Sequence, residues 1–488
     1  MALTADNISH RHLTQSQYKH RLKMSQHAYG SPTYAHSDHI IGGSRRNKLY
    51  EAFCNYCSGL ALFVLPSWYP AFLAGRSRIP SPSHASPTSF LDGMRGYASL
   101  VVFVSHFAEP FRPAKELGYG YRDNNHLFQL PIIRLFHSGI PMVSIFFVVS
   151  GYALSYRPLA LIRHGLWADL LDNMSSAIFR RGMRLFLPAT ISTFIVLLTI
   201  VLGIDDFPGY RTLPGFIEAR PKHLANVLEQ FADWARFITL ELMNPWSWRV
   251  FDYRYDSHLW TIPIEFKASI VLFLVIIGLA RTCTAVRFTL AAASFVYCMW
   301  FEKWEVALFI GGMGMAEMQQ IQLERGVLLI RRAWLAIFIW STVIICGLFL
   351  LSFPIRHSAE TPGFMMLSML TSNYWNWHTY GAILVVWSAS NCGILQKPFA
   401  TPFAGYLGRI SYAMYLVHGS ALHSVGYGVV SVIWEYLGSE HHQLGLVISF
   451  VMIAPIVFWF ADMFWRIVDE PSMRIAKVLY AKLSAQNF

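Results

Sequence analysis

The sequence has little charge. Only 14% of its 488 residues are Asp, Glu, Lys or Arg, whereas 54% are hydrophobic. Soluble proteins carry about 25% charged residues, so this shortage argues against a soluble protein and favours one embedded in a membrane. The net charge is +11, but the basic residues are scattered between apolar runs and form no patch. We therefore expect no nucleic acid among its partners.

Cysteine is also scarce, and its pattern excludes several kinds of site. The six cysteines show no disulfide framework, and Cys54 and Cys57 form a lone Cys-x-x-Cys pair without a second half. A zinc or redox site is therefore not predicted there. No other cluster of metal ligands is visible, so we expect no metal and no permanently bound cofactor. No apolar core follows Met1 closely, which argues against an ordinary signal peptide.

Composition divides the chain into five segments. Residues 1–50 are polar, lack helical periodicity and are predicted to be a disordered cytosolic tail. Residues 51–75 are apolar but contain Pro66 and Pro70, which predicts a helix lying on the membrane, with a span as the alternative. A Pro- and Ser-rich linker over 76–88 precedes the membrane domain, residues 89–470. Residues 471–488 are predicted to be a cytosolic tail.

Ten apolar runs fill the membrane domain. They centre near residues 98, 143, 193, 271, 292, 311, 343, 386, 414 and 455. A helix needs about 20 mainly apolar residues to cross a bilayer, and the runs near 292 and 311 are the weakest. With the N-terminus in the cytosol, most basic residues fall in inner loops and few in short outer loops. We predict an all-α integral membrane protein with about ten transmembrane helices and both termini in the cytosol.

The first run contains Arg95 and His106, separated by ten residues. Eleven helical steps come within about 20° of three turns, so both side chains lie on one face, about 16 Å apart along the axis. Asp92, three residues before Arg95, can face it. Charged groups inside a membrane are costly and usually functional. The alternative is that Arg95 and His106 are interfacial residues that reach opposite sides of the membrane.

Two further short sequence motifs lie in the second predicted span and at the start of the third. Ser150 and Gly151 are small residues that let another helix or a ligand approach closely. Arg180, Arg181 and Arg184 lie at the cytosolic edge of the third span, where arginines bind phosphates well. The alternative is that these arginines only anchor the helix by the positive-inside rule.

Glu265 lies where a long outer loop, which ends near Trp260, returns to the membrane. A carboxylate there is too costly to keep without a partner or a task. Its candidate partners are Lys267, Arg254 and His106, although Lys267 points away from it on a helix. A late span adds three polar groups, Arg409, Ser411 and His418, of which the histidine is more typical of a packed residue than of a catalyst.

Five strings in order resemble the acyltransferase 3 family of multi-pass membrane acyltransferases, and its fungal members most. They are residues 90–107, 146–152, 181–188, 259–266 and 407–418, and the resemblance covers about 88–470. It implies transfer of an acyl group, often acetyl, from acyl-CoA to a hydroxyl of a sugar, lipid or secondary metabolite. The family's signature, an Arg and a His with ten residues between, falls on Arg95 and His106. Lys267 departs from the family pattern.

The resemblance implies different roles for the two ends of the first span. Arg95 and the arginines of the third span hold the phosphates of acyl-CoA, whose pantetheine arm reaches toward His106. We expect His106 to be the general base for the acceptor hydroxyl, with a covalent acyl-imidazole as the rival role. Glu265 is expected to orient His106. The supporting residues are Asp92, Ser150, Gly151, Trp260, Arg409, Ser411 and His418, and the acceptor is expected to be selected by loop 204–258 and the aromatic stretch 373–377.

Two other functions suit the same topology. A transporter or flippase also has many spans with charged groups inside the membrane, but no inverted repeat is visible. A non-catalytic scaffold has no physical need for Arg95, His106 and Glu265 together.

Overall fold

A computed structural model describes residues 66–67, 88–111, 116–122, 125–204, 213, 215, 218, 220–246, 254–326, 329–330, 332–438 and 441–484. The chain divides into two compact units, Met1–Phe63 with Arg163–Gly165 and Val64–Ile162 with Leu166–Phe488. Our description concerns the second unit. The predicted tail over 1–50 lies outside the described residues, as do the interfacial segment over 51–75, except residues 66–67, and the linker over 76–88, except Thr88.

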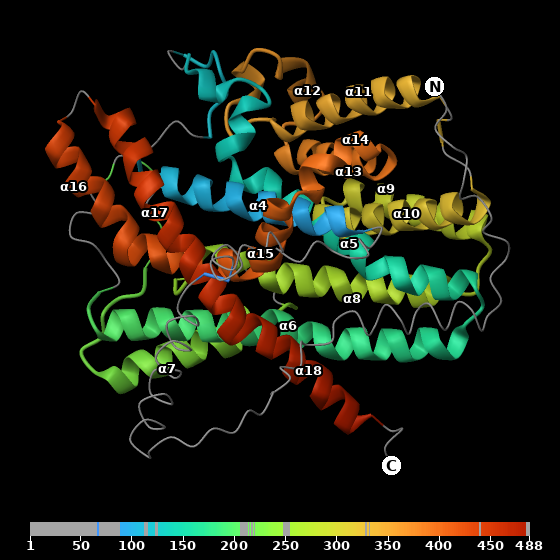
Figure 1. Ribbon diagram of the computed structural model, residues 1–488, viewed down its shortest axis with the longest axis horizontal. Helices are drawn as coiled ribbons and strands as arrows, with labels where there is room; N and C mark the ends of the chain where they lie inside the picture. Colours follow the sequence, from blue (N-terminus) through green and yellow to red (C-terminus); the bar gives the residue numbers. More distant parts are fainter. Residues whose placement is uncertain are drawn as a thin grey trace, which may run out of the picture. The chain divides into compact units, whose positions relative to one another are not determined.

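All ten predicted span centres fall within helices (Figure 1). These helices are α4 (Ser89–Ala108), α5 (Gly139–Arg163), α6 (Trp167–Val201), α8 (Thr261–Leu279), α9 (Thr284–Trp300), α10 (Trp304–Arg325), α11 (Ala333–Leu351), α13 (Tyr374–Asn391), α15 (Pro402–Ala421) and α17 (His442–Phe464). The regular structure of the described residues is helical throughout.

Six described stretches are long and apolar enough to cross a membrane. They are Gly139–Arg163, Trp167–Val201, Ser257–Leu279, Ala333–Leu351, Pro402–Leu437 and His442–Leu483. Among the other four predicted spans, α9 has only 17 residues. Helices α4, α10 and α13 are long enough but less apolar; α4 contains Asp92, Arg95 and His106. The structure therefore supports a multi-pass membrane protein with at least six candidate crossings in the part of the chain that it describes.

Shorter elements join these helices, and the sequence did not predict them. The loop over 204–258 contains α7 and the π-turn η5, and the predicted C-terminal tail contains most of α18. The additional helices are α7 (Val227–Phe237), α12 (Met365–Leu370), α14 (Gly393–Gln396), α16 (Tyr427–Leu437) and α18 (Glu470–Leu483). The short turns are η1 (Glu109–Phe111), η2 (Leu127–Gln129), η3 (Ile133–His137), η5 (Ile238–Leu242), η6 (Ser257–Trp260), η7 (Ser358–Glu360), η8 (Lys397–Ala400), η9 (Leu422–Gly426) and η11 (Trp465–Asp469).

Helix α4 packs closely along α15, and glycines make this approach possible. A Cβ added to Gly96 would come within 2.5 Å of the Gly408 nitrogen, and one added to Gly408 within 2.4 Å of the Asp92 carbonyl oxygen. Lipid tails are as apolar as side chains, so close packing of small residues is a main source of helix association in a membrane. The contact brings the polar residues of α15 alongside the first predicted span.

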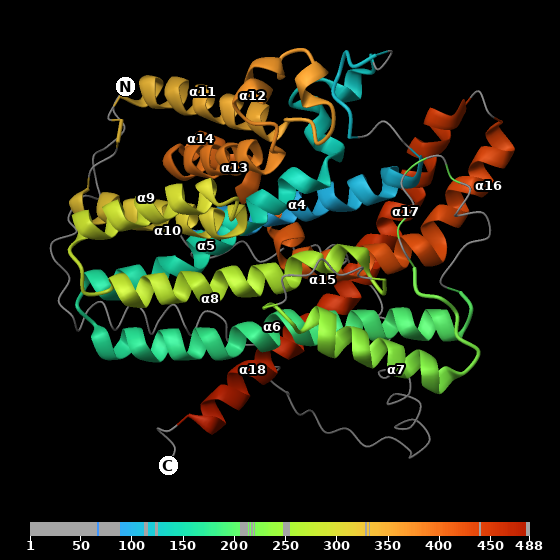
Figure 2. The ribbon, with the colours of Figure 1, turned by 180° about the vertical axis from the view of Figure 1, so that it is seen from behind.

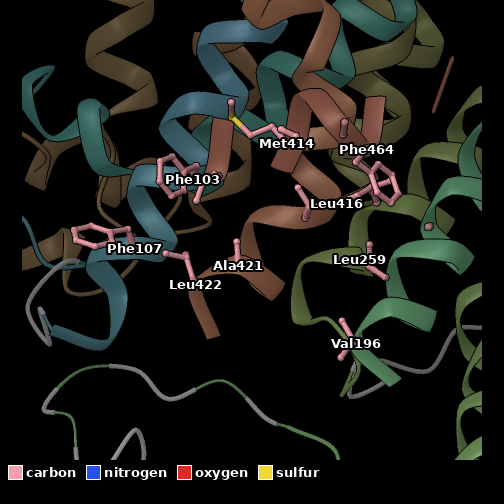
Figure 3. Packing of buried hydrophobic residues seen from close by; sticks show 14 of the residues in the cluster. Phe103, Phe107, Val196, Leu259, Met414, Leu416, Ala421, Leu422 and Phe464 are labelled. Atoms are coloured by element: carbon pink, nitrogen blue, oxygen red, sulfur yellow. The ribbon is translucent and has the colours of Figure 1, made fainter. Parts of the chain in front are cut away.

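Apolar side chains from several helices surround this contact. Figure 3 shows Phe103 and Phe107 of α4 in the same cluster as Met414 and Leu416 of α15, all of them buried. Leu259, which lies between His258 and Trp260, belongs to the same cluster. The cluster therefore fixes the ends of α4, α15 and η6 relative to one another.

The predicted close approach at Ser150 and Gly151 is confirmed. A Cβ on Gly151 would come within 2.4 Å of the Phe309 carbonyl oxygen on α10. In the reverse direction, a Cβ on Gly312 would come within 2.4 Å of the Val148 carbonyl oxygen on α5. Glycines on both helices let the two backbones touch.

Candidate active site

His106 lies in the last turn of α4, where the helix gives way to η1. Its Nδ1 is 2.9 Å from a carboxylate oxygen of Glu109, which follows three residues later and so shares its face of the turn. The same nitrogen is 3.3 Å from Glu218. The His106 side chain is 23% exposed and lines a pocket, so a small molecule can reach it. Two carboxylates on Nδ1 leave Nε2 as the nitrogen available for chemistry.

Glu218 comes from the loop between α6 and α8 and contacts three imidazoles. Besides His106, its carboxylate is 3.1 Å from His258 Nε2 and 3.1 Å from His423 Nε2. Burial by itself raises the pKa of the Glu218 carboxyl, but the charge of His258 and hydrogen bonds from the three imidazoles outweigh it and hold the pKa well below its usual value. Glu218 is therefore ionised at neutral pH.

The loop that supplies Glu218 is attached to the end of α4. The Gly215 N–H donates to the Pro110 carbonyl oxygen at 2.7 Å. A Cβ on Gly215 would come within 2.1 Å of the Glu109 carbonyl oxygen, so the contact requires glycine. This attachment holds Glu218 near His106.

His258 is buried between two carboxylates. Asp256 caps η6 by accepting from the His258 backbone N–H, and the same carboxylate oxygen lies 2.6 Å from His258 Nδ1. The His258 ring lies edge-on to the His106 ring, with centroids 3.8 Å apart. A Cβ on Gly419 of α15 would come within 2.8 Å of His258 Cε1, so only glycine leaves room for the ring.

His418 completes the group from α15. It is fully buried, and its Nδ1 donates to the Met414 carbonyl oxygen at 2.9 Å, as a packed histidine does. Its ring centroid is 4.4 Å from that of His258 and 5.3 Å from that of His106. The sequence signalled His418 only as a polar residue in a span, whereas the structure brings it into the same cluster as His106.

Two overlapping sets of side chains in this cluster could hold a metal ion. One is His106, His258 and His418, and the other is His106, Glu109 and Glu218; within each, the ligand atoms lie within 4.8 Å of one another. The sequence revealed neither set, because the members come from α4, η1, the outer loop, η6 and α15. Both nitrogens of His258 already face carboxylates, an arrangement that suits a protonated ring better than a metal ligand.

Polar and aromatic side chains line the pocket beside His106. The Tyr415 hydroxyl lies at its wall, donates to the His258 carbonyl oxygen and lies 2.6 Å from Thr261 Oγ1. Trp260 also lines the pocket, and its ring centroid is 6.1 Å from that of Trp375 in the aromatic stretch 373–377. Four apolar residues also line the pocket: Val102, Ile140, Val143 and Ile355.

The other end of α4 holds a cluster of fixed charges. α4 is an uninterrupted helix, so the three-turn spacing of Arg95 and His106 holds. Arg95 Nη1 is 4.0 Å from the Asp92 carboxylate, at the limit of an ion pair. The charge of Arg184 interacts with those of Arg95, Arg181, Asp469 and Glu265. This end therefore gathers the guanidinium groups of Arg95, Arg181 and Arg184, together with carboxylates that partly offset them.

Glu265 pairs with an arginine of this cluster. The carboxylates that contact His106 belong to other residues. Its carboxylate accepts from Arg181 Nη2 at 2.5 Å and from the Ser150 hydroxyl at 3.1 Å. Figure 2 shows α6 and α8, which carry Arg181 and Glu265, side by side. Glu109 and Glu218, rather than Glu265, are the carboxylates that contact His106 among the described residues.

The remaining predicted residues have local partners. Lys267 lies 3.8 Å from Glu305 on α10. Arg254 lies 3.7 Å from Asp233. Arg180 donates to the Ser176 carbonyl oxygen of its own helix, and Ser411 donates to Gly408 in the same way. Arg409 is exposed and lies 5.9 Å from the ring of Trp465.

Sequence reasoning missed Glu109, Glu218, Asp256 and His423. Two of them carried a signal: Asp256 precedes His258 by two residues, as a helix cap does, and Glu109 follows His106 by three. Glu218 and His423 carried none, because their contact joins residues 205 positions apart.

Known proteins resemble this chain over most of its length. A family model described as an acyltransferase domain matches residues 88–466. The O-acetyltransferase PaAT-1 of Phomopsis amygdali is 32% identical over 442 residues, covering 81% of this chain and 85% of that protein. Acyltransferase clz18 of Cochliobolus lunatus is 25% identical over 469 residues, covering 84% of this chain and 99% of that protein. Acyltransferase R4 of a Phoma species is 26% identical, with the same coverage of each chain. No solved structure matches.

Proposed function

We propose, from the premise that this chain belongs to that acyltransferase family and is a multi-pass membrane enzyme, that it is an O-acyltransferase using acyl-CoA. The acceptor is a hydroxyl of a sugar, lipid or secondary metabolite. Acetyl is the favoured acyl group, because a relative that is 32% identical is named an O-acetyltransferase. The observation that carries the proposal is His106 at the wall of a pocket, with carboxylates on its Nδ1.

His106 acts as the general base in this proposal. Its Nε2 takes the proton of the acceptor hydroxyl while the oxygen attacks the thioester carbonyl. The tetrahedral intermediate then expels the CoA thiolate, which takes the same proton back from the imidazolium. Such a base contributes about 10²–10⁴-fold to the rate. The rival role is a covalent acyl-imidazole.

Glu109 and Glu218 take the role that we expected of Glu265. Their contacts with His106 Nδ1 favour the tautomer with hydrogen on that nitrogen, which leaves Nε2 free to accept a proton. They also stabilise the imidazolium that forms during the reaction, as the carboxylate of a triad does.

The arginine cluster is the proposed site for the CoA phosphates. Arg95 and Arg184 are better placed than Arg181, which is engaged by Glu265, and Arg180, which donates to its own helix. Arg95 is about 16 Å from His106 along the helix axis, a distance comparable to the length of the pantetheine arm. Bound acyl-CoA would then lie along α4, with its phosphates at the Arg95 end and its thioester at the His106 end.

We propose that all ten helices that coincide with predicted spans cross the membrane, with both termini in the cytosol. Six of them lie in stretches that are apolar and long enough by composition. The distribution of basic residues supports the orientation. It puts Arg95 toward the cytosol, where acyl-CoA is available, and the pocket beside His106 toward the opposite side.

A thermal-shift titration with acetyl-CoA and CoA tests the donor site. A ligand that binds only the folded protein raises its stability by about 2.7 kcal/mol at 100 times the dissociation constant. We expect wild type to be stabilised, Arg95→Ala to lose most of that effect, and Arg281→Ala, the matched control at an exposed position between α8 and α9, to keep it. A folded wild-type protein that neither ligand stabilises would contradict the donor assignment.

A further inference from the structure

Part of the wall of the candidate active-site pocket comes from outside the helices that coincide with predicted spans. Glu116 and Arg134 of the connection between α4 and α5 line it, and so does Ile355, which follows the end of α11. The two segments are joined, since Arg356 Nε lies 2.6 Å from the Glu116 carboxylate. They are separate from the loop and the aromatic stretch that we expected to select the acceptor.

Arg134 of η3 is held firmly at this wall. It is buried, with 3% of its surface exposed. Its Nη1 donates to the Ser352 carbonyl oxygen and its Nη2 to the Glu116 carbonyl oxygen, both at 3.3 Å. The Ser138 hydroxyl donates to the Arg134 carbonyl oxygen at 2.8 Å, which fixes the backbone of the same turn. These contacts give the guanidinium one position on the pocket wall.

The backbone just before Arg134 is strained. Ile132 has a φ of 69°, which makes it an outlier for a β-branched residue. Its N–H donates to the Ser352 hydroxyl at 2.7 Å, so the residue that holds the guanidinium also holds this turn. Strain of this kind persists only where the surrounding structure fixes it, and it is concentrated at ligand-binding sites. The placement of Arg134 is therefore built into the fold.

Arg134 brings a fixed positive charge to the pocket. Burial lowers the pKa of its guanidinium to about 10, although the charge of Glu116 opposes this, so the group stays protonated at neutral pH. A guanidinium donates hydrogen bonds and accepts none, so its partner in a ligand is an oxygen with a lone pair. Glu109 and Glu116 also line the pocket, and their carboxylates disfavour an anionic ligand. The partner is therefore a neutral hydroxyl or carbonyl oxygen.

The pocket is small, with a volume of about 110 Å³. A cavity of about 150 Å³ binds a benzene molecule, so this pocket holds the reacting end of an acceptor, about the size of one ring. His106 and Arg134 both line this volume. An oxygen that reaches Arg134 therefore lies on the same ring as the hydroxyl that reaches His106, or within a few bonds of it.

We propose that Arg134 is an acceptor-binding residue, whose guanidinium donates to a second, neutral oxygen of the acceptor close to the hydroxyl that is acylated. The acceptor class is a diol or a hydroxy ketone whose two oxygens lie near each other. That the ligand is an acyl acceptor rests on the proposed function. The pocket suits this role because it lies at the His106 end of α4, away from the arginines proposed to hold acyl-CoA.

Three single-ring probes test the proposal: cyclohexanol, the cyclohexanediol with adjacent hydroxyls, and the corresponding hydroxy ketone. Release of CoA thiol from acetyl-CoA gives kcat/KM for each. We expect wild type to prefer the two-oxygen probes to cyclohexanol by about 10–100-fold, as a hydrogen bond to a charged group allows. Arg134→Gln should reduce this preference to below about threefold, and Arg134→Lys, which keeps the charge but not the planar fork, should retain part of it.

The preference is a ratio, so a loss of folded protein cancels from it and a merely structural role does not move it. Arg356→Gln is the matched control, because it removes another guanidinium that contacts Glu116 at an exposed position that does not line the pocket. It should keep the wild-type preference. A wild-type preference below about threefold, an undiminished preference in Arg134→Gln, or an equal loss in Arg356→Gln would overturn the proposal.

A second variant serves if the Arg134 variants do not fold. Ser352→Ala removes the hydroxyl that holds the strained turn before Arg134 but leaves the guanidinium in the chain. We expect it to lose part of the preference for the two-oxygen probes. An unchanged preference in folded Ser352→Ala would contradict the proposal as well.

Binding of the same probes separates the proposal from the function on which it rests. A thermal-shift titration without acetyl-CoA reports binding to the folded protein. Stabilisation by the diol that is lost in Arg134→Gln, with no thiol release from any probe, would sustain the Arg134 site and contradict acyl transfer. Thiol release with equal kcat/KM for the three probes would sustain the function and overturn the proposal. Neither stabilisation nor release would overturn the proposal, whereas the acetyl-CoA titration still decides the proposed function.

Discussion

The two ends of α4 both lie among charged groups, but the cationic side chains at the two ends differ in their chemistry. At one end Arg95 lies near Arg184, and their partners Asp92, Glu265 and Asp469 partly neutralise a set of fixed cations. At the other end His106 lies among carboxylates and further imidazoles. Guanidinium stays charged at any accessible pH, whereas imidazole titrates near neutrality.

This difference suggests what each end can do. Fixed cations bind phosphate but cannot move protons, and titratable rings move protons but bind anions weakly. One uninterrupted helix separates the two tasks by three turns. Experiments that alter only one end should therefore change either donor binding or chemistry, and they should leave the other property intact.

The largest expected effect comes from Glu218. Removing one partner from a buried charged network costs about 3 kcal/mol, so Glu218→Gln should lower the melting temperature as well as the rate. The pKa of Glu218 is held well below 4.5 in the folded protein, so its contribution to stability is complete above that value. It is lost as the pH falls below 4.5 toward the folded-state pKa.

Melting temperatures between pH 3 and pH 7 measure this contribution. Wild type should lose stability below pH 4.5 more steeply than Glu218→Gln, so the two curves should converge at low pH. Glu360→Gln, at a position where the side chain is 63% exposed, is the control and should follow wild type. Parallel curves for wild type and Glu218→Gln would mean that Glu218 is not the low-pKa group of the cluster.

A smaller effect is expected from the space beside His258. Gly419→Ala places a Cβ within 2.8 Å of the His258 ring, and such overpacking costs about 1–3 kcal/mol. Gly405→Ala lies on the same helix with nothing within 4 Å and should be neutral or slightly stabilising. Acyl transfer should fall in Gly419→Ala while acetyl-CoA binding is retained. Equal behaviour of the two variants would remove the argument for tight packing at His258.

The smallest effect should follow metal removal. Side chains that could hold a metal ion are present, but an imidazolium at His258 disfavours a second cation beside it. Dialysis against a chelator should therefore leave the rate of acyl transfer unchanged, as checked by elemental analysis before and after. If the chelator abolished activity and zinc restored it, His106 would have to be assigned as a metal ligand instead of a base.

The sequence predicted the scaffold better than the reaction centre. Apolar runs give helices because burying backbone polar groups in a membrane requires helical hydrogen bonding, and every predicted centre lies in a helix. The pair Arg95 and His106 is visible because both lie on one regular helix. Lys267, which departs from the family pattern, lies near a carboxylate that the sequence did not identify, Glu305.

The carboxylates around His106 could not be predicted in the same way. Glu218 stands in a polar loop, where an acidic residue is ordinary and no periodicity says which way it faces. Its contact with His106 depends on the Gly215 attachment to Pro110 and on the position of η6 against α15. Glu265 was the more conspicuous carboxylate because it lies in an apolar helix, yet Arg181 satisfies it. The apolar surroundings of Glu265 indicated that it needs a partner, but only the structure shows that this partner is Arg181.

The most direct test of the account is His106→Gln, measured for both acetyl-CoA binding and acetyl-CoA turnover. Turnover is the release of CoA thiol in the presence of an extract of hydroxyl-bearing metabolites, with His126→Gln as the control. We predict that turnover falls by about 10²–10⁴-fold while the dissociation constant for acetyl-CoA changes by less than about threefold. Turnover above a tenth of the wild-type rate in folded His106→Gln would contradict the assignment of His106 as the base.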